Sequence, residues 1–403
     1  MQQLLMHYGL YKKFVSLLSG RIPITLILLT VGPVTFSGCA RLPPGHTGRS
    51  EIESVEIAQS SVKAQYKIGF CWAYATIGLI ESNYKISHGK ELNLSEEALG
   101  YARMKEEMLQ LGAAVRSGRT AMQEALNATQ GSGLEGWYVR TGDGDRRRDA
   151  MELIDDYGLV PEDSWNVKFE SAAEVASLKN ALLQPFYRLL SSTEEISPQA
   201  IDKVLTSPGA FPSSPPKSIV FNNVSLSPVT FASQTLQFHS GDYVSLQSSR
   251  AADMPRLMDA MKRMMAAGYS VPLSFAVSFD NLDQGFFRAA NYELAELDGD
   301  QLLASSLLHV VGGHAVLATD FVNRGGQEGA LAPAALQVEL LKDPEEIEYV
   351  KFKNSWGTLA STNERGVTVT SGSDGYYRMD AGYIKANAAI GRLGVVVLRQ
   401  FAQ

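Results

Sequence analysis

The order of secondary-structure patterns along the chain constrains its fold more than any other feature. Helical patterns dominate the first half, and across 71–87 the residues Ala75, Leu79 and Tyr84 share one face of a helix. Short runs rich in β-branched and aromatic residues dominate the last third, from 271 to 401. Helices and strands that are segregated in this way are typical of α+β proteins. The sequence therefore predicts an α+β fold with a helical lobe followed by a β-rich lobe.

Further helices are expected before that sheet. The pattern predicts a helix over 95–127 with Ser95 as its N-cap, and another over 147–158. A methionine-rich helix is expected over 251–270, and its methionines are interpreted as core residues rather than as a cofactor site. The stretch 207–218 contains too many Pro, Gly and Ser residues to form one continuous element.

Residues 1–38 resemble a secretory signal. The segment contains Lys12, Lys13 and Arg21 but no acidic residue, and it continues into the apolar run 24–36. That run is shorter than the ~20 apolar residues that a membrane-spanning helix needs. A basic start, a short apolar stretch and small residues at the end are typical of export signals. The sequence therefore predicts that 1–38 is a signal peptide.

The end of this segment predicts how the exported protein is attached to a membrane. The tetrapeptide "FSGC" at 36–39 resembles a bacterial lipobox, which implies lipidation of Cys39 and a lipidated tether over 39–60. The protein is then expected to be a membrane-anchored lipoprotein, and Ala40 is compatible with the outer membrane and periplasm of a bacterium. Ordinary secretion and a retained helical anchor are the alternatives.

Charge and cysteine content narrow the functional classes. The 403-residue chain has a net charge of −7 and no basic stripe, so a nucleic acid is not an expected partner. It contains two cysteines, and lipidation of Cys39 would leave Cys71 unable to form an internal disulfide. The sequence therefore indicates that Cys71 serves a purpose other than crosslinking.

Cys71 lies at the expected start of the 71–87 helix. The thiolate is the nucleophilic form of cysteine, and both a helix N-terminus and a nearby imidazolium lower the pKa of a thiol. The alternative interpretation is a small buried apolar residue between Phe70 and Trp72. Position alone leaves both interpretations open.

Four motifs together resemble the papain-like cysteine peptidases (peptidase C1 family). Gln65 lies six residues before Cys71, "HAV" begins at His314, "NSWG" begins at Asn354, and "GYYRM" follows, all in the order found in that family. The resemblance implies a two-lobed papain-like fold over 61–403. It also implies a cysteine-type peptidase that hydrolyses peptide or amide bonds, with no metal or organic cofactor.

The resemblance assigns a role to each of these positions. Cys71 would be the nucleophile, and His314 would be its base and later protonate the leaving amine. Asn354 would accept a hydrogen bond from the imidazole and orient it. Gln65, together with the backbone N–H of Cys71, would donate to the oxyanion. Trp356 would shield the bond between imidazole and amide from water.

A second histidine, His309, competes with His314 for the role of the base. Only His314 is followed by Ala-Val.

The spacing of the motifs sets this chain apart from shorter family members. His314 lies 243 residues after Cys71, against the ~130–150 residues that are usual. Insertions are therefore expected over 166–250 and 323–346, and this longer form has some likeness to the bleomycin hydrolase branch.

Substrate recognition is the least determined part of this interpretation. Gly144 and Asp145 fall where family members bind substrate backbone, and an aspartate there could clash with an extended peptide or select a basic one. The expected partner is a peptide or protein substrate, and the sequence does not define the oligomeric state. The alternatives are an inactive papain-like binding module, and an acyltransferase or transpeptidase that uses Cys71.

Overall fold

The computed structural model describes eight stretches of the chain, all within the compact unit Thr47–Gln403. They are 57–65, 69–118, 146–289, 304–323, 347–357, 361–362, 368–369 and 374–402. The predicted signal peptide, Cys39, Gly144, Asp145 and most of the predicted insertion 323–346 lie outside the described residues.

The helices described in the first part of this unit are α2 (Cys71–His88), α3 (Glu96–Arg116) and α5 (Arg146–Tyr157). The helix predicted over 71–87 is confirmed within one residue. The prediction for α5 is also confirmed, because the helix ends at Tyr157 and Gly158 follows with a left-handed φ of 75°.

The N-cap of α3 is confirmed, but its predicted C-terminus at 127 is wrong. The side chain of Ser95 accepts a hydrogen bond from the backbone N–H of Ala98 at 3.2 Å. The helix ends at Arg116, and Gly118 takes a left-handed φ of 71° that interrupts the helical backbone. The apolar periodicity of the sequence continues beyond Gly118, so it did not reveal the turn at which the helix ends.

The segment 166–250 contributes small elements that pack on the first helices. They are α6 (Ala172–Ser191), α7 (Pro198–Leu205), β1 (Ile219–Phe221), β2 (Val224–Leu226), α8 (Pro228–Thr230) and β3 (Tyr243–Gln247). Helices α6 and α7 pack against α3, and α8 packs against α5. As predicted, 207–218 forms no helix or strand.

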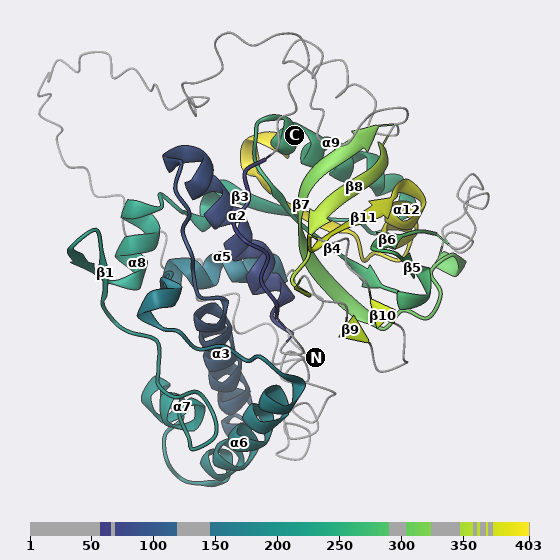
Figure 1. The fold of residues 1–403 in the computed structure, drawn as a ribbon. Helices are drawn as coiled ribbons and strands as arrows, with labels where there is room; N and C mark the ends of the chain where they lie inside the picture. The colour runs from purple at the N-terminus through teal and green to yellow at the C-terminus, as the bar shows by residue number, and fades with distance from the viewer. Residues whose placement is uncertain are drawn as a thin grey trace, which may run out of the picture. The chain divides into compact units, whose positions relative to one another are not determined.

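The last part of the unit is built on a sheet whose described strands run in the order β3-β12-β4-β7-β8-β11-β6-β5. The strands not yet bounded are β4 (Val271–Val277), β5 (Leu282–Asp283), β6 (Phe286–Phe287), β7 (Gly312–Asn323), β8 (Ile347–Lys353), β11 (Tyr376–Asp380) and β12 (Gly394–Leu398). The pair β11–β6 is parallel and the other pairs are antiparallel. A separate short pair joins β9 (Ser361–Thr362) to β10 (Thr368–Val369). The α+β class is therefore confirmed (Figure 1).

The α-helices described alongside the sheet are α9 (Met254–Ala266) and α12 (Ala381–Ala389). The methionines of α9 are buried in the core, as the sequence predicts; they are Met254, Met258, Met261, Met264 and Met265. None of the described helices combines the length and apolar character needed to span a bilayer.

Helix α2 lies against the central strand β7, which connects the helical part to the sheet (Figure 1). The contact is close at Gly78, where a Cβ atom would lie 3.0 Å from Cδ2 of Leu317. Glycine at this position therefore lets the strand approach the helix backbone. The first turn of α2 begins seven residues earlier, at Cys71.

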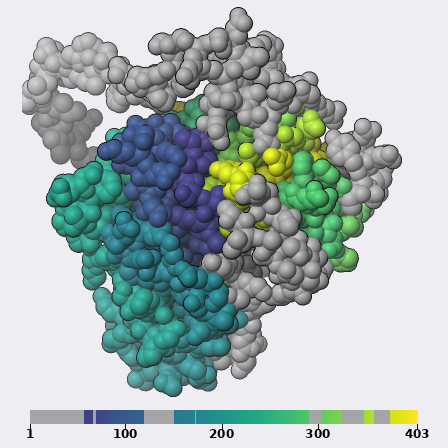
Figure 2. Space-filling view, viewed as in Figure 1, coloured from purple at the N-terminus to yellow at the C-terminus, as the bar shows by residue number. Residues whose placement is uncertain are grey.

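The first described segment, 57–65, pairs with residues that come much later in the sequence. The backbone N–H of Gln65 donates to the carbonyl of Ser355 at 2.7 Å, and Ala64 forms a β-bridge with Trp356. In the space-filling view the purple atoms of the first described residues adjoin yellow atoms from the C-terminal part (Figure 2). This pairing brings Gln65 next to the turn after β8.

Candidate active site

A buried pair of side chains joins β7 to the turn after β8. Nε2–H of His314 donates to Oδ1 of Asn354 at 2.8 Å, and both residues are buried. A carbonyl oxygen can only accept a hydrogen bond, so Nε2 carries the proton of the neutral ring. Nδ1 is then the basic nitrogen of the imidazole.

Aromatic rings cover this pair. The indole of Trp356 stacks on the imidazole of His314 with centroids 4.8 Å apart and an angle of 22° between the planes. Phe275 meets the same imidazole edge-on at 5.9 Å. Phe279 and Tyr377 pack against Trp356 at 5.6 and 5.5 Å. The apolar cover excludes water from the bond between His314 and Asn354, which strengthens that bond.

Burial also decides the charge of the imidazole. It lowers the pKa of His314 to about 4, against the smaller, opposing effect of the hydrogen bond to Asn354. The imidazole is therefore neutral at neutral pH unless a negative charge lies beside it. A neutral ring with a basic Nδ1 is the form that can take a proton from a thiol.

Cys71 is the first residue of α2 and is half-buried against the core. Gly69, two residues earlier, has a left-handed φ of 79°, and Phe70 supplies no side-chain cap to the helix. The ring of Phe70 is fully buried over Gly100 of α3, where a Cβ atom would lie 2.2 Å from the ring. This packing fixes the residue directly before the thiol at the positive end of the helix.

Gln65 is buried next to the turn that carries Asn354. Its backbone is held by Ser355, as described above, but no described residue donates a hydrogen bond to Oε1 of its side-chain amide. Buried amides normally find partners within the protein. The oxygen of this buried amide therefore has no hydrogen-bond partner in the described part of the chain.

The two histidines that compete in the sequence have different surroundings. The side chain of His309 is 70% exposed, and its Nδ1 lies 2.6 Å from Oδ2 of Asp280. His314 is buried and bonded to Asn354 instead. Within the described residues, no group of three or more His, Cys, Asp or Glu side chains is arranged to hold a metal ion.

Sequence reasoning missed a buried ionic cluster beside these residues. Nζ of Lys63 donates to Oε1 of Glu81 at 3.0 Å, to Oε1 of Glu96 at 2.8 Å and to the carbonyl of Leu94 at 2.8 Å. Burial opposes the charge of Lys63, but Glu96 and Glu81 raise its pKa well above the ordinary value. The available signal was Glu81, an acidic residue within an otherwise apolar stretch of α2.

Comparison with known proteins supports a papain-family relationship over a limited part of the chain. The family model for papain family cysteine proteases matches residues 50–107, a range that contains Gln65 and Cys71. Viral cathepsins of the Choristoneura fumiferana and Antheraea pernyi nuclear polyhedrosis viruses are each 50% identical over 40 residues. These matches cover 10% of this chain and only 12% of the relatives' own length.

Comparison with solved structures returns plant cysteine proteases at low similarity. The Carica candamarcensis cysteine protease CMS1MS2 in complex with E-64 has 14% identity and a TM-score of 0.33, covering 84% of this chain and 92% of that one. The bromelain protease from Ananas comosus in complex with E64 has 16% identity and a TM-score of 0.36, covering 85% and 95%.

Proposed function

We propose that this chain is a papain-like cysteine peptidase that hydrolyses peptide or amide bonds with Cys71 as its nucleophile. The observation that carries the proposal is the buried hydrogen bond between His314 and Asn354 beneath Trp356. His314 lies on β7, the strand against which the helix of Cys71 packs. The match to the papain family over 50–107, a range that contains Cys71, also supports the proposal.

The close contact between α2 and β7 supports an encounter of the thiol with the imidazole. Cys71 lies seven residues before Gly78, which is ~10 Å along a helix. His314 lies three residues before Leu317, which is ~10 Å along a strand. Because Gly78 and Leu317 touch, Cys71 and His314 each lie only this short length of chain from one shared contact point.

The chemistry follows from the groups present. Nδ1 of His314 takes the proton of the Cys71 thiol, and the sulfur attacks the substrate carbonyl carbon. The C–N bond breaks as the imidazolium returns its proton to the leaving amine, which leaves a thioester on the sulfur. Water then attacks that thioester, the C–S bond breaks, and the carboxylic acid and the thiol are released. The negative sulfur stabilises the imidazolium against its burial while the pair exists.

Gln65 is the proposed side-chain donor to the oxyanion. Substitution of Gln65 by alanine is expected to lower kcat by roughly 10²–10³-fold with a much smaller change in KM, because the donor acts on charge that develops in the transition state. Steady-state kinetics on a fluorogenic peptide measure both constants. A rise in KM with unchanged kcat would assign Gln65 to ground-state binding instead.

The function itself is tested by incubating the purified protein with a mixed peptide library, with and without an added amine. Cleaved peptides that end in a free carboxylate are expected in both samples. Amide products that dominate when amine is present would indicate acyl transfer rather than hydrolysis. A library left intact, together with no labelling by a thiol-directed epoxide peptide, would contradict the enzyme assignment.

Two sequence predictions stand beside this proposal without a structural test. Lipidation at Cys39, with export to a membrane, is proposed from the lipobox-like segment alone. The likeness to the bleomycin hydrolase branch likewise stays a prediction.

A further inference from the structure

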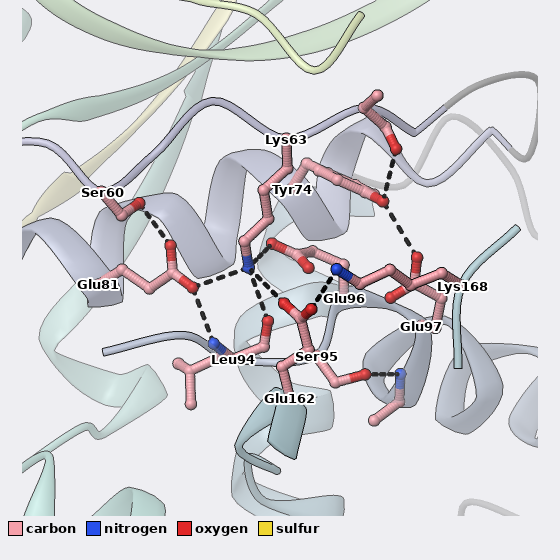
Figure 3. A network of polar contacts seen from close by, with 12 residues as sticks. Ser60, Lys63, Tyr74, Glu81, Leu94, Ser95, Glu96, Glu97, Glu162 and Lys168 are labelled. Carbon is pink, nitrogen blue, oxygen red and sulfur yellow. Dashed lines mark hydrogen bonds and ion pairs between the residues drawn. The ribbon is translucent and has the colours of Figure 1, made fainter. Parts of the chain in front are cut away.

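The hydroxyl of Tyr74, on the first turn of α2, lies between two acceptors (Figure 3). It is 3.2 Å from the backbone carbonyl oxygen of Ala64 and 3.1 Å from Oε1 of Glu97. A hydroxyl has a single proton to donate. Tyr74 can therefore make a full hydrogen bond to only one of these two oxygens at a time.

The protonation state of Glu97 decides which acceptor receives that proton. An ionised carboxylate only accepts hydrogen bonds and is the stronger acceptor, so it draws the hydroxyl proton away from Ala64. A protonated carboxyl group instead donates to the oxygen of Tyr74, which leaves the hydroxyl proton for the Ala64 carbonyl. Glu97, Tyr74 and the Ala64 carbonyl therefore form a chain of hydrogen bonds. The bond between Tyr74 and Glu97 reverses its direction of donation when Glu97 gains or loses a proton.

The Ala64 carbonyl belongs to the peptide bond that leads into Gln65. The N–H of the same peptide bond is held by the carbonyl of Ser355 at 2.7 Å. With both of its polar groups bonded, this peptide plane is fixed, and the direction in which the Gln65 side chain leaves the backbone is fixed with it. Loss of the bond from Tyr74 leaves one of the two restraints.

The surroundings of Glu97 disfavour its charged form relative to a solvated carboxylate. The residue is 4% exposed, and burial raises its pKa, against hydrogen bonds to its own backbone and to Tyr74. Burial and the carboxylates of Glu97 and Glu96 raise the pKa of Tyr74 far above its usual value, so the phenol keeps its proton. The charged and titratable groups around the pair are Lys63 from the first segment, Glu81 from α2, Glu96 from α3, Glu162 from η3 (Glu162–Ser164), and Lys168.

A cavity gives the proton of Glu97 a route. Tyr74, Ala64 and Glu97 together line a space of about 420 Å³, with Lys63 and Glu162 on its wall. The exchange of a proton at Glu97 therefore does not require the helices to separate.

We propose that Tyr74 and Glu97 are positioning residues for Gln65, and that protonated Glu97 is the state in which Tyr74 holds the peptide before Gln65. The inference rests on the proposed peptidase function. It assigns neither residue to contact with the substrate. It predicts that oxyanion stabilisation weakens as pH rises through the pKa of Glu97.

The test compares wild type with Tyr74→Phe, Glu97→Gln and the double variant across the whole pH range in which the wild type stays folded. At the acidic end, kcat of wild type is expected to exceed that of Tyr74→Phe about fivefold, the worth of one hydrogen bond. That ratio is expected to fall towards one as Glu97 ionises. In the Glu97→Gln background the ratio is expected to stay near fivefold throughout, because the glutamine N–H₂ donates to Tyr74 at every pH.

A ratio that does not change with pH in the wild-type background overturns the inference, since loss of packing alone would produce that result. A ratio that changes with pH to the same extent in the Glu97→Gln background also overturns the inference. Tyr101→Phe is the control, because its hydroxyl bonds Asp202 and Ser214 in a different part of the helical region. A wild type that cleaves no peptide removes both proposals, whereas a cleaving wild type with a flat ratio removes this one alone.

Discussion

Substitution of Cys71 by serine is expected to lower kcat/KM for peptide cleavage by ~10⁴-fold or more. Serine keeps the size of the side chain at the start of α2, so the fold is expected to persist. A hydroxyl, however, holds its proton far more tightly than a thiol does. The buried imidazole of His314 is a weak base, with its pKa lowered to about 4, and cannot remove that proton.

The measurement is the initial rate of cleavage of a peptide selected from the library experiment. Cys39→Ser is the matched control, because it removes the chain's other thiol and leaves the proposed nucleophile in place. Its kcat/KM on a soluble peptide is expected to equal that of wild type. Substantial activity in Cys71→Ser would rule out Cys71 as the proposed nucleophile.

Substitution of Glu81 by leucine is expected to lower the free energy of unfolding by ~3–5 kcal/mol. The carboxylate is 1% exposed and accepts hydrogen bonds from Ser60, Lys63 and the backbone N–H of Leu94, at 2.5, 3.0 and 2.8 Å. Leucine fills much of the space but accepts none of these bonds. It therefore leaves buried donors unsatisfied and removes one of the carboxylates that balance the charge of Lys63.

Urea unfolding followed by circular dichroism measures this loss. Glu91→Leu is the control, because Glu91 also pairs with a lysine, Lys85, at 2.8 Å, but on the exposed surface. Surface ion pairs contribute little, so its midpoint is expected to stay close to that of wild type. Equal midpoints for the Glu81 and Glu91 variants would show that the buried cluster does not stabilise the fold.

The residues proposed for the site were identified in the sequence because each belongs to a short motif, and the structure adds the hydrogen bond between His314 and Asn354. The helix after Cys71 and the strand carrying His314 were also predictable, since their periodicity is local. The end of α3 was not, because one glycine, Gly118, stops a helix whose apolar spacing continues. The pairing of β3 with β12 joins residues 243–247 to 394–398, and no local pattern reports such a partner.

The polar groups around the site were not predictable for a related reason. Lys63 meets Glu81 and Glu96, which lie 18 and 33 residues further along the chain. Lys63 lies before α2, so no single helix contains either pair, and the contacts exist only after the segment 57–65 packs against α2 and α3. The two acceptors of Tyr74 likewise come from the first segment and from α3. Tertiary packing, rather than local preference, creates these arrangements.

The most direct test of the account is the pH dependence of alkylation at Cys71, followed by mass spectrometry that resolves its peptide from that of Cys39. In wild type, the rate with iodoacetamide is expected to titrate well below the ~8.5 of an unperturbed thiol, because His314 takes the proton and stabilises the thiolate. In His314→Ala the midpoint is expected to rise towards the unperturbed value. Identical midpoints near or above ~8.5 in both proteins would contradict activation of Cys71 by His314.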